Sequence, residues 1–342
     1  MDMRNKNMYN QPIFFRKNRV SRVYIGGKLF DDFLADGSTD GFYPEEWIAS
    51  AVSALSSLGE SEGVSVTEDG DNFAEILRKG GNDIVGPRGK MRILVKYLDS
   101  AIRLPAQAHP DREFSRKHFN SEYGKTESWV ILGVREGAKL YFGFKDGVSE
   151  EDFRAAIAAS EHDKDAMQEL MEVITPKVGD VYLVPAKTIH ALGAGCLILE
   201  VQEPTDFTIQ PERWCGDYRL SDEQMYLGLS LDDAVDCFKL GTSSSPRIEP
   251  AVVASDSGLR KESLIGKKHT PCFEINRILL DGASYTLSVD DSYAVYIVTD
   301  GCATLTGEGY ERSLRRGDYF FMPYSAMGKY SVCGNATLVE CY

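Results

Sequence analysis

The stretches Lys177-Val-Gly-Asp-Val-Tyr-Leu-Val-Pro185 and Arg315-Arg-Gly-Asp-Tyr-Phe-Phe-Met-Pro323 share one pattern. In each stretch a Gly-Asp turn leads into an apolar run that ends at proline, which is typical of a turn followed by a buried strand. The recurrence of this pattern in both halves of the chain predicts a duplicated β-barrel. After the shared part, only the first copy continues to a histidine, His190, because the second continues through Tyr324 to Lys329 without one.

Short apolar or alternating runs on either side of the two stretches predict further strands. In the first half these runs are 93–98, 129–132, 139–144, 180–185 and 196–201, and in the second half they are 284–288, 293–298, 303–306, 318–323 and 336–340. Because the strands after Phe273 follow one another without helical segments, they favour a small barrel or sandwich.

Helical segments interrupt the first half of the chain. Pro44-Glu45-Glu46 before an apolar run predicts a helix that extends to Val52, since proline and acidic residues favour a first helical turn. Further helices are predicted at 72–78, at 149–173 with a break near 161–163, and at 221–239. The Ser- and Pro-containing run 241–246 predicts a linker, which divides the chain into domains 1–245 and 246–342.

Composition limits the possible functions. The 342 residues exceed one average domain, and 43% hydrophobic residues suit a globular protein. With 38 basic against 52 acidic residues the net charge is −14, which argues against nonspecific binding to nucleic acid or to anionic membranes. A phosphorylated substrate would therefore need a local basic pocket.

The sequence predicts a cytoplasmic protein. Residues 1–18 lack the apolar region of a secretory signal, and no later stretch reaches about 18 uninterrupted apolar residues. The seven cysteines are scattered without a CxxC pair, which fits reduced thiols better than a disulfide framework or a cysteine metal site.

Four side chains suggest a zinc site: Gln107, His109, Glu127 and His190. Zinc favours imidazole nitrogen and accepts carboxylate and carbonyl oxygen. Gln107 and His109 are two residues apart, so on a strand both side chains point to the same face. The chain has five histidines, and the other three, His118, His162 and His269, stand in polar surroundings typical of a surface.

Three ordered motifs resemble the signatures of the type I mannose-6-phosphate isomerase family in its short bacterial form. They are Gln107-Ala-His109-Pro110-Asp111, Gly124-Lys125-Thr126-Glu127, and Gly179-Asp180 followed by Pro185 and His190-Ala191-Leu192. The likeness extends over about residues 20 to 240 and includes Gly26-Gly27 and Pro44-Glu45-Glu46-Trp47.

The resemblance implies a zinc-dependent double cupin, mainly β, with a degenerate second cupin that lacks metal ligands. It implies one Zn2+ per chain, held by Gln107, His109, Glu127 and His190, with Lys96 and Lys125 as pocket lysines. It also implies a sugar phosphate as the partner, and we expect a monomer or homodimer.

Two positions depart from the family pattern. Gln210 stands where the family has an arginine, and Pro105 stands where it has a serine-like residue. A neutral amide cannot replace a guanidinium as the charge partner of a phosphate or an enediolate. Arg213, three residues further on, is the candidate to take over that role.

The resemblance implies interconversion of mannose 6-phosphate and fructose 6-phosphate through an enediol. Lys96, Lys125 and Glu200 are the candidates for proton transfer, and the lysines could instead neutralise phosphate charge. Gln210 leaves two alternatives open: an isomerase or epimerase of another sugar on the same metal cupin, and a noncatalytic sugar-sensing cupin.

Overall fold

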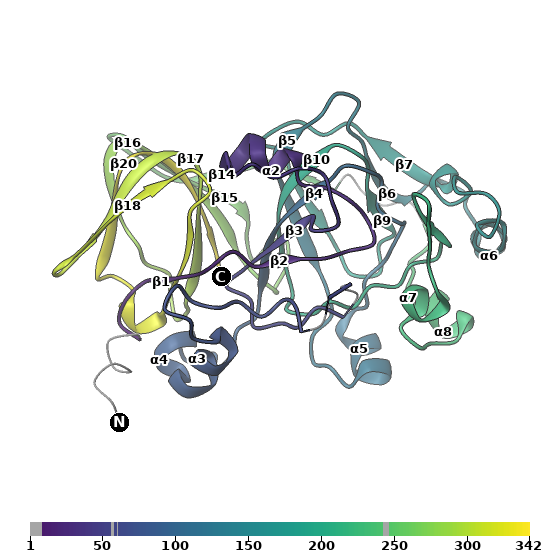
Figure 1. Cartoon of the computed structure of the whole chain (residues 1–342), viewed down its shortest axis with the longest axis horizontal. Helices are drawn as coiled ribbons and strands as arrows, with labels where there is room; N and C mark the ends of the chain where they lie inside the picture. The colour runs from purple at the N-terminus through teal and green to yellow at the C-terminus, as the bar shows by residue number, and fades with distance from the viewer. Residues whose placement is uncertain (1–8, 56–57, 60, 242–245) are drawn as a thin grey trace.

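The protein folds into two β-rich bodies that lie side by side, with the C-terminal strands in yellow forming one of them (Figure 1). The structure, a computed structural model, describes residues 9–55, 58–59, 61–241 and 246–342. The predicted linker and the domain boundary fall on residues 242–245, which lie outside the described residues. The prediction of a mainly β protein with two barrels and helical insertions is confirmed.

The first barrel is built on an antiparallel sheet of seven strands. Their order is β13 (Arg247–Ile248), β8 (Val181–Val184), β5 (Glu127–Val134), β10 (Cys196–Gln202), β4 (Leu94–Ser100), β3 (Glu45–Ile48) and β2 (Arg19–Val20). A three-stranded sheet of β7 (Met171–Ile174), β6 (Leu140–Phe144) and β9 (His190–Leu192) accompanies it, as does the pair β11 (Trp214–Cys215) and β12 (Tyr218–Arg219).

The second barrel is an antiparallel sheet of eight strands. Its order is β1 (Ile13–Phe14), β19 (Tyr319–Met322), β17 (Ala294–Gly307), β20 (Tyr330–Cys341), β16 (Ile275–Thr286), β15 (Leu259–Ile265) and β14 (Ala251–Asp256), with β18 (Tyr310–Arg315) on β17. Strand β1 comes from the N-terminal part of the chain and β13 follows the predicted linker, so each sheet takes an end strand from the opposite side of that linker.

The two Gly-Asp turns have the same structure in both barrels. The carboxylate of Asp180 accepts a hydrogen bond from the backbone N–H of Lys177 at 2.9 Å, and Asp318 accepts one from Arg315 at 2.9 Å. The glycine directly before each aspartate has a positive φ, 91° at Gly179 and 92° at Gly317. Glycine adopts this region without the strain that other residues incur. The sequence pattern therefore marks a true structural repeat.

The helices lie at the periphery. They are α2 (Lys28–Leu34), α3 (Phe73–Gly80), α4 (Asn82–Val85), α5 (Arg112–Phe119), α6 (Glu150–Ala159), α7 (Asp222–Tyr226) and α8 (Leu231–Val235), with 3-10 turns at Gln168–Leu170 and Tyr324–Ala326. Helix α3 starts after an Asn72 cap and α6 after a Ser149 capping box, as the sequence indicated. The predicted helix 149–173 ends early, because 171–174 form β7, and 221–239 splits into α7 and α8.

The predicted helix over 44–52 is wrong, because residues 45–48 form strand β3. Its residues pair with 95–98 of β4, and Arg19 and Val20 of β2 pair on the other side. All four residues of β3 are buried. Successive side chains of a strand point to opposite faces. Glu45 and Trp47 therefore lie on one face of β3, and Glu46 and Ile48 lie on the other. Pairing with β4 thus overrides a helix-like sequence.

One hydrophobic cluster joins the two barrels. It includes Ile48 and Leu199 from the first barrel together with Ile275, Val295 and Phe321 from the second. The ring of Phe321 packs edge-on against Phe73 and stacks on Tyr293. No helix in the described part of the chain is both long and apolar enough to cross a membrane.

Candidate metal centre

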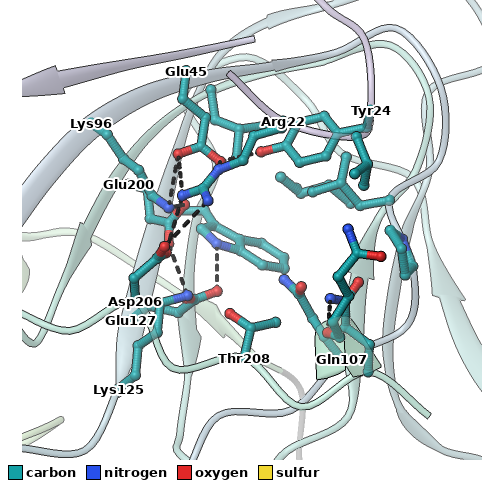
Figure 2. Close-up of a pocket in the computed structure, with 18 of the residues that line it drawn as sticks. Arg22, Tyr24, Glu45, Lys96, Gln107, Lys125, Glu127, Glu200, Asp206 and Thr208 are labelled. Atoms are coloured by element: carbon teal, nitrogen blue, oxygen red, sulfur yellow. Dashed lines mark hydrogen bonds and ion pairs between the residues drawn. The ribbon is translucent and has the colours of Figure 1, made fainter. Parts of the chain in front are cut away.

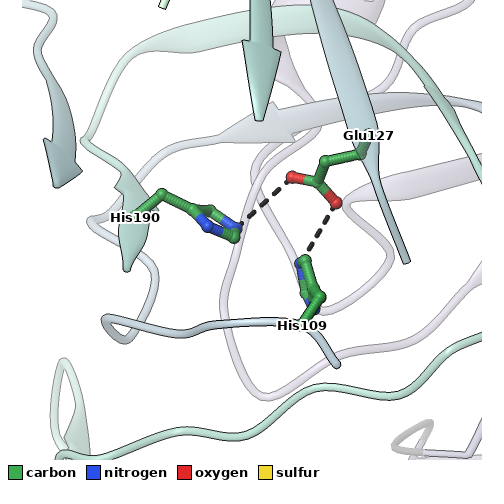
Figure 3. Close-up of side chains that lie close together, drawn as sticks. All are labelled: His109, Glu127 and His190. Atoms are coloured by element: carbon green, nitrogen blue, oxygen red, sulfur yellow. Dashed lines mark ion pairs between the residues drawn. The ribbon is translucent and has the colours of Figure 1, made fainter. Parts of the chain in front are cut away.

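Three of the predicted ligands meet inside the first barrel (Figure 3). Nε2 of His109 lies 3.1 Å from one carboxylate oxygen of Glu127, and Nε2 of His190 lies 3.3 Å from the other. One donor atom from each of the three residues falls within 4.8 Å of the others, and all three side chains are buried. Glu127 follows His109 by 18 positions and precedes His190 by 63. The fold brings the three together, with Glu127 at the start of β5 and His190 at the start of β9.

Both imidazole rings are oriented for metal binding. Nδ1 of His109 lies 2.9 Å from the carbonyl of Phe207, and Nδ1 of His190 lies 2.9 Å from the carbonyl of Thr188. A carbonyl only accepts, so each Nδ1 carries the proton and each Nε2 is unprotonated, with its lone pair on the side of Glu127. The lone pair of His109 accepts from the Lys125 ammonium at 2.8 Å. This tautomer is the one that an Nε2 metal ligand requires.

The charge state of the cluster also suits a cation. Burial, reinforced by the ammonium of Lys125, lowers the pKa of His109 to about 3, and burial likewise lowers the pKa of His190. Burial alone would raise the pKa of Glu127, but Lys125 and the two imidazoles hold it well below its usual range. The cluster at neutral pH is two neutral imidazoles and one carboxylate, a donor set that fits zinc.

Gln107 lies next to these three residues. Its backbone exchanges two hydrogen bonds of 2.9 Å with that of His190, which places both side chains on one face. The Gln107 amide lies 3.3 Å from Nε2 of His190. An amide group can present either its nitrogen or its oxygen, so Gln107 fits the role of a fourth ligand.

A pocket opens beside this cluster. Figure 2 shows charged side chains along one wall, among them Glu45 of β3, Lys96 of β4, Glu127 of β5 and Glu200 of β10, and Gln107 on the other. The pairing of β4 explains the wall, because Trp47 and Glu200 are both opposite Lys96 in the two neighbouring strands. Cross-strand partners share a face of the sheet.

The predicted catalytic residues Lys96, Lys125 and Glu200 all line this pocket. Nζ of Lys96 lies 3.4 Å from Glu200, and Nζ of Lys125 lies 3.8 Å from Glu200 and 2.9 Å from Glu127. Burial, with the neighbouring Glu127 carboxylate, raises the pKa of Glu200 to about 8. For Lys96 the attraction of Glu200 and Glu45 outweighs the opposite effect of burial, and its pKa is raised. Lys96 therefore stays charged.

Arg213 is not among the residues that line the pocket. Its guanidinium pairs with Glu161 at 2.7 Å and with Asp222 at 2.7 Å. The structure therefore does not bring Arg213 together with the other predicted site residues. Gln210 and Pro105, the two departures from the family pattern, do line the pocket.

Sequence reasoning missed a second group of pocket residues around Glu45. The Glu45 carboxylate accepts from Arg22 Nε at 3.0 Å, from Trp47 Nε1 at 2.6 Å and from the Tyr24 hydroxyl, and Lys96 Nζ lies 3.4 Å away. Arg22 also pairs with Asp206 at 3.0 Å. The one available signal was the short motif Pro44-Glu45-Glu46-Trp47, which had been assigned to a helix.

The fold and the site define a double cupin with a candidate metal centre in its first barrel. A family model described as the cupin domain of mannose-6-phosphate isomerase matches residues 268–342. A mannose-6-phosphate isomerase of Streptococcus mutans is 28% identical over 92% of this chain and 92% of its own length, and ManA of Bacillus subtilis is 25% identical over 98% of each. The resemblance to the mannose-6-phosphate isomerase family is thereby confirmed.

Solved structures confirm the architecture. A mannose 6-phosphate isomerase from Bacillus subtilis superposes with a TM-score of 0.78 at 23% identity, covering 97% of this chain and 99% of that one. The isomerase of Salmonella typhimurium in its apo form gives 0.71 at 13% identity, covering 97% and 98%. Both likenesses include the two barrels together.

Proposed function

We propose that this chain is a zinc-dependent aldose–ketose isomerase that interconverts mannose 6-phosphate and fructose 6-phosphate through an enediol. The observation that supports it most is the buried His109, Glu127 and His190 cluster, which borders a pocket with paired lysines and carboxylates. Relatives over more than nine-tenths of the chain bear the name of this enzyme, which supports the substrate.

The reaction moves a proton between C1 and C2 of the sugar, so it needs a positioned base. Glu200 and Lys125 border both the pocket and the metal cluster, and their groups lie 3.8 Å apart. Geometry makes these two the candidates that touch the reacting carbons. A zinc ion held by Gln107, His109, Glu127 and His190 would supply Lewis-acid polarisation of a sugar oxygen.

Lys96 has a different role in this proposal. Because it keeps its proton between Glu45 and Glu200, it cannot act as a base near neutral pH. Its ammonium instead fixes the position of Glu200 and stabilises negative charge that develops in the pocket.

The test compares two histidine variants. His109→Ala removes a proposed ligand, whereas His118→Ala removes a ring that packs at a tilt against Phe114 and lies outside the pocket. We expect the wild type and His118→Ala to interconvert mannose 6-phosphate and fructose 6-phosphate, and His109→Ala to lose metal and turnover together. Protein that binds metal but turns over no sugar phosphate would contradict the proposal.

One observation favours a second candidate, an isomerase or epimerase of an unphosphorylated sugar. Each cation that lines the pocket already pairs with a carboxylate: Arg22, Lys96 and Lys125. The Gln210 amide donates one N–H to the backbone carbonyl of Gln224 at 3.0 Å, which leaves its carbonyl oxygen and one N–H for a ligand. These neutral groups suit a sugar hydroxyl, and they supply no positive charge to a phosphate dianion.

The two candidates differ in substrate preference. The second predicts a higher kcat/KM for mannose than for mannose 6-phosphate, and the first predicts the reverse. A noncatalytic sugar-binding protein would bind either compound in calorimetry and convert neither, even when saturated with zinc.

A further inference from the structure

A second cavity lies between the two barrels, and we name it the interbarrel cleft. It is separate from the pocket beside the metal cluster, because the two share no lining residue. Five cationic side chains line it: Lys17, Arg19, Arg312, Arg315 and Arg316. Four carboxylates, those of Asp36, Glu46, Glu68 and Asp318, line it as well, so what the cleft offers an anion depends on which cations these carboxylates leave unpaired.

Ion pairs within the cleft use only part of this charge. Lys17 and Arg19 share Asp36, at 2.7 and 2.9 Å, and Arg19 also pairs with Glu46 at 2.7 Å. Arg312 forms two hydrogen bonds of 2.7 and 2.8 Å with Glu68. Among the described residues, Arg315 and Arg316 have no carboxylate partner within ion-pair distance. The cleft therefore keeps two guanidinium groups for a ligand.

The arginine side of the cleft is held in place by aromatic rings. The guanidinium of Arg312 lies 3.5 Å from the centre of the Phe14 ring, and that of Arg316 lies 5.6 Å from the Phe33 ring. Arg316 also donates to the backbone carbonyl of Asp32 at 3.4 Å. A site whose cations are already oriented loses less entropy when it binds an anion.

The repeated turn shows that the two arginines are not needed for the fold. In the first barrel the equivalent Gly-Asp turn forms the same hydrogen bond with Lys177 and Val178 in their place. A turn that forms without an arginine pair in one copy does not explain the pair in the other. Ligand binding does explain it, because planar guanidinium groups bind phosphate oxygens in pairs.

We propose that the interbarrel cleft is a second binding site, for a small molecule that carries a phosphoryl dianion. Arg315 and Arg316 supply the primary contacts, and Lys17 faces them from the first barrel. This inference is independent of the proposed isomerase activity.

The cleft and the pocket beside the metal cluster lie on opposite sides of the strand pair β2 and β3. Arg19 of β2 pairs with Glu46 of β3, and both line the cleft, whereas Arg22 and Glu45 line the pocket. Phosphate could also enter the pocket, so the experiment must assign any binding to one face. Variants on each face make that assignment.

The experiment is calorimetric titration of the zinc-loaded full-length protein with inorganic phosphate. Four proteins are compared: wild type, Arg315→Ala/Arg316→Ala, Lys125→Met in the pocket, and Lys267→Ala/Lys268→Ala. The last removes two cations of the second barrel that do not line the cleft. Thermal unfolding of each protein shows that the fold is retained.

We expect the arginine double variant to bind phosphate about ten-fold more weakly or worse, because it loses the charge-assisted hydrogen bonds. Lys267→Ala/Lys268→Ala should bind phosphate as the wild type does. Lys125→Met should retain the phosphate binding that the arginine double variant loses. Binding should also weaken as salt is added. Equal affinity in the arginine variant, loss of all binding in Lys125→Met, or no binding by the wild type at millimolar phosphate would each overturn the proposal.

Discussion

The ammonium nitrogen of Lys125 lies 2.8 Å from Nε2 of His109, the atom that faces the metal position. The same ammonium lies 2.9 Å from Glu127, so one lysine contacts two candidate ligands and also lines the pocket beside them. Lys125 thus joins the metal centre to the place where the substrate would bind.

Replacing Lys125 with methionine should separate metal binding from turnover. The four candidate ligands remain, so zinc content should be unchanged, whereas kcat should fall by about 100-fold or more if the ammonium takes part in proton transfer. The control is Lys117→Met, an exposed lysine of α5. Wild-type kcat in Lys125→Met would exclude the lysine from the reaction.

Gln210→Arg should shift substrate preference toward phosphorylated sugars. A guanidinium at this wall would be the only lining cation without a prior carboxylate partner, and a hydrogen bond to a charged group contributes about 1.5–3 kcal/mol. The ratio of kcat/KM for mannose 6-phosphate over mannose should therefore rise by about ten-fold or more. A ratio that stays the same would show that position 210 does not face the sugar's distal end.

Glu45 should stabilise the protein only at pH values where it is ionised. Burial opposes ionisation, but Arg22 and Lys96 outweigh it and hold the pKa of Glu45 well below its ordinary value of 4.5. A depressed pKa means that the unfolded chain binds more protons in this range, so the contribution is present above about pH 4.5 and is lost as pH falls. Glu45→Gln should cost about 3–5 kcal/mol at neutral pH and less in acid, as urea unfolding would measure.

Its neighbour Glu46 should show the opposite dependence. Burial raises the pKa of Glu46 above 4.5 despite the nearby Arg19. The folded state then binds more protons than the unfolded chain, so the contribution of Glu46 is lost as pH rises through its folded pKa. Relative to wild type, Glu46→Gln should gain stability with rising pH where Glu45→Gln loses it. The same sign of slope for both variants would contradict these assignments.

Phe321→Ala should destabilise both barrels together. The side chain is fully buried in the cluster that joins them, and removal of such a ring costs about 3–5 kcal/mol. We expect a single unfolding transition at a lower midpoint. Phe42→Ala, at a ring that is 52% exposed, should change stability by less than about 0.5 kcal/mol. Separate transitions for the two barrels would show that the shared core does not couple them.

The sequence predicted those features that depend on local patterns. The Gly-Asp turns before Val181 and Tyr319 repeat because each needs a glycine with positive φ and an aspartate that accepts from the turn. Gln107 and His109 do reach the same site, but Gln107 lies in an isolated bridge to His190 and not in a strand, so strand periodicity was not what placed the pair. Their role as ligands stays a prediction.

Features that depend on distant pairing were not predictable. Arg22 reaches Asp206 across 184 positions, and no local pattern relates them. Strand β3 was taken for a helix because its proline, acidic residues and apolar run match a helix start as well as a strand. Pairing with its neighbours β2 and β4 makes this segment a strand. The same pairing places Glu45 in the pocket.

The metal content of the purified protein tests the central claim most directly. Mass spectrometry of the wild type should find about one zinc per chain, and His109→Ala should have lost it while His118→Ala retains it. Both imidazoles present an unprotonated Nε2 to the same point, so loss of one ring should empty the site. A wild type without metal after growth in zinc, or a full complement of zinc in His109→Ala, would contradict the account.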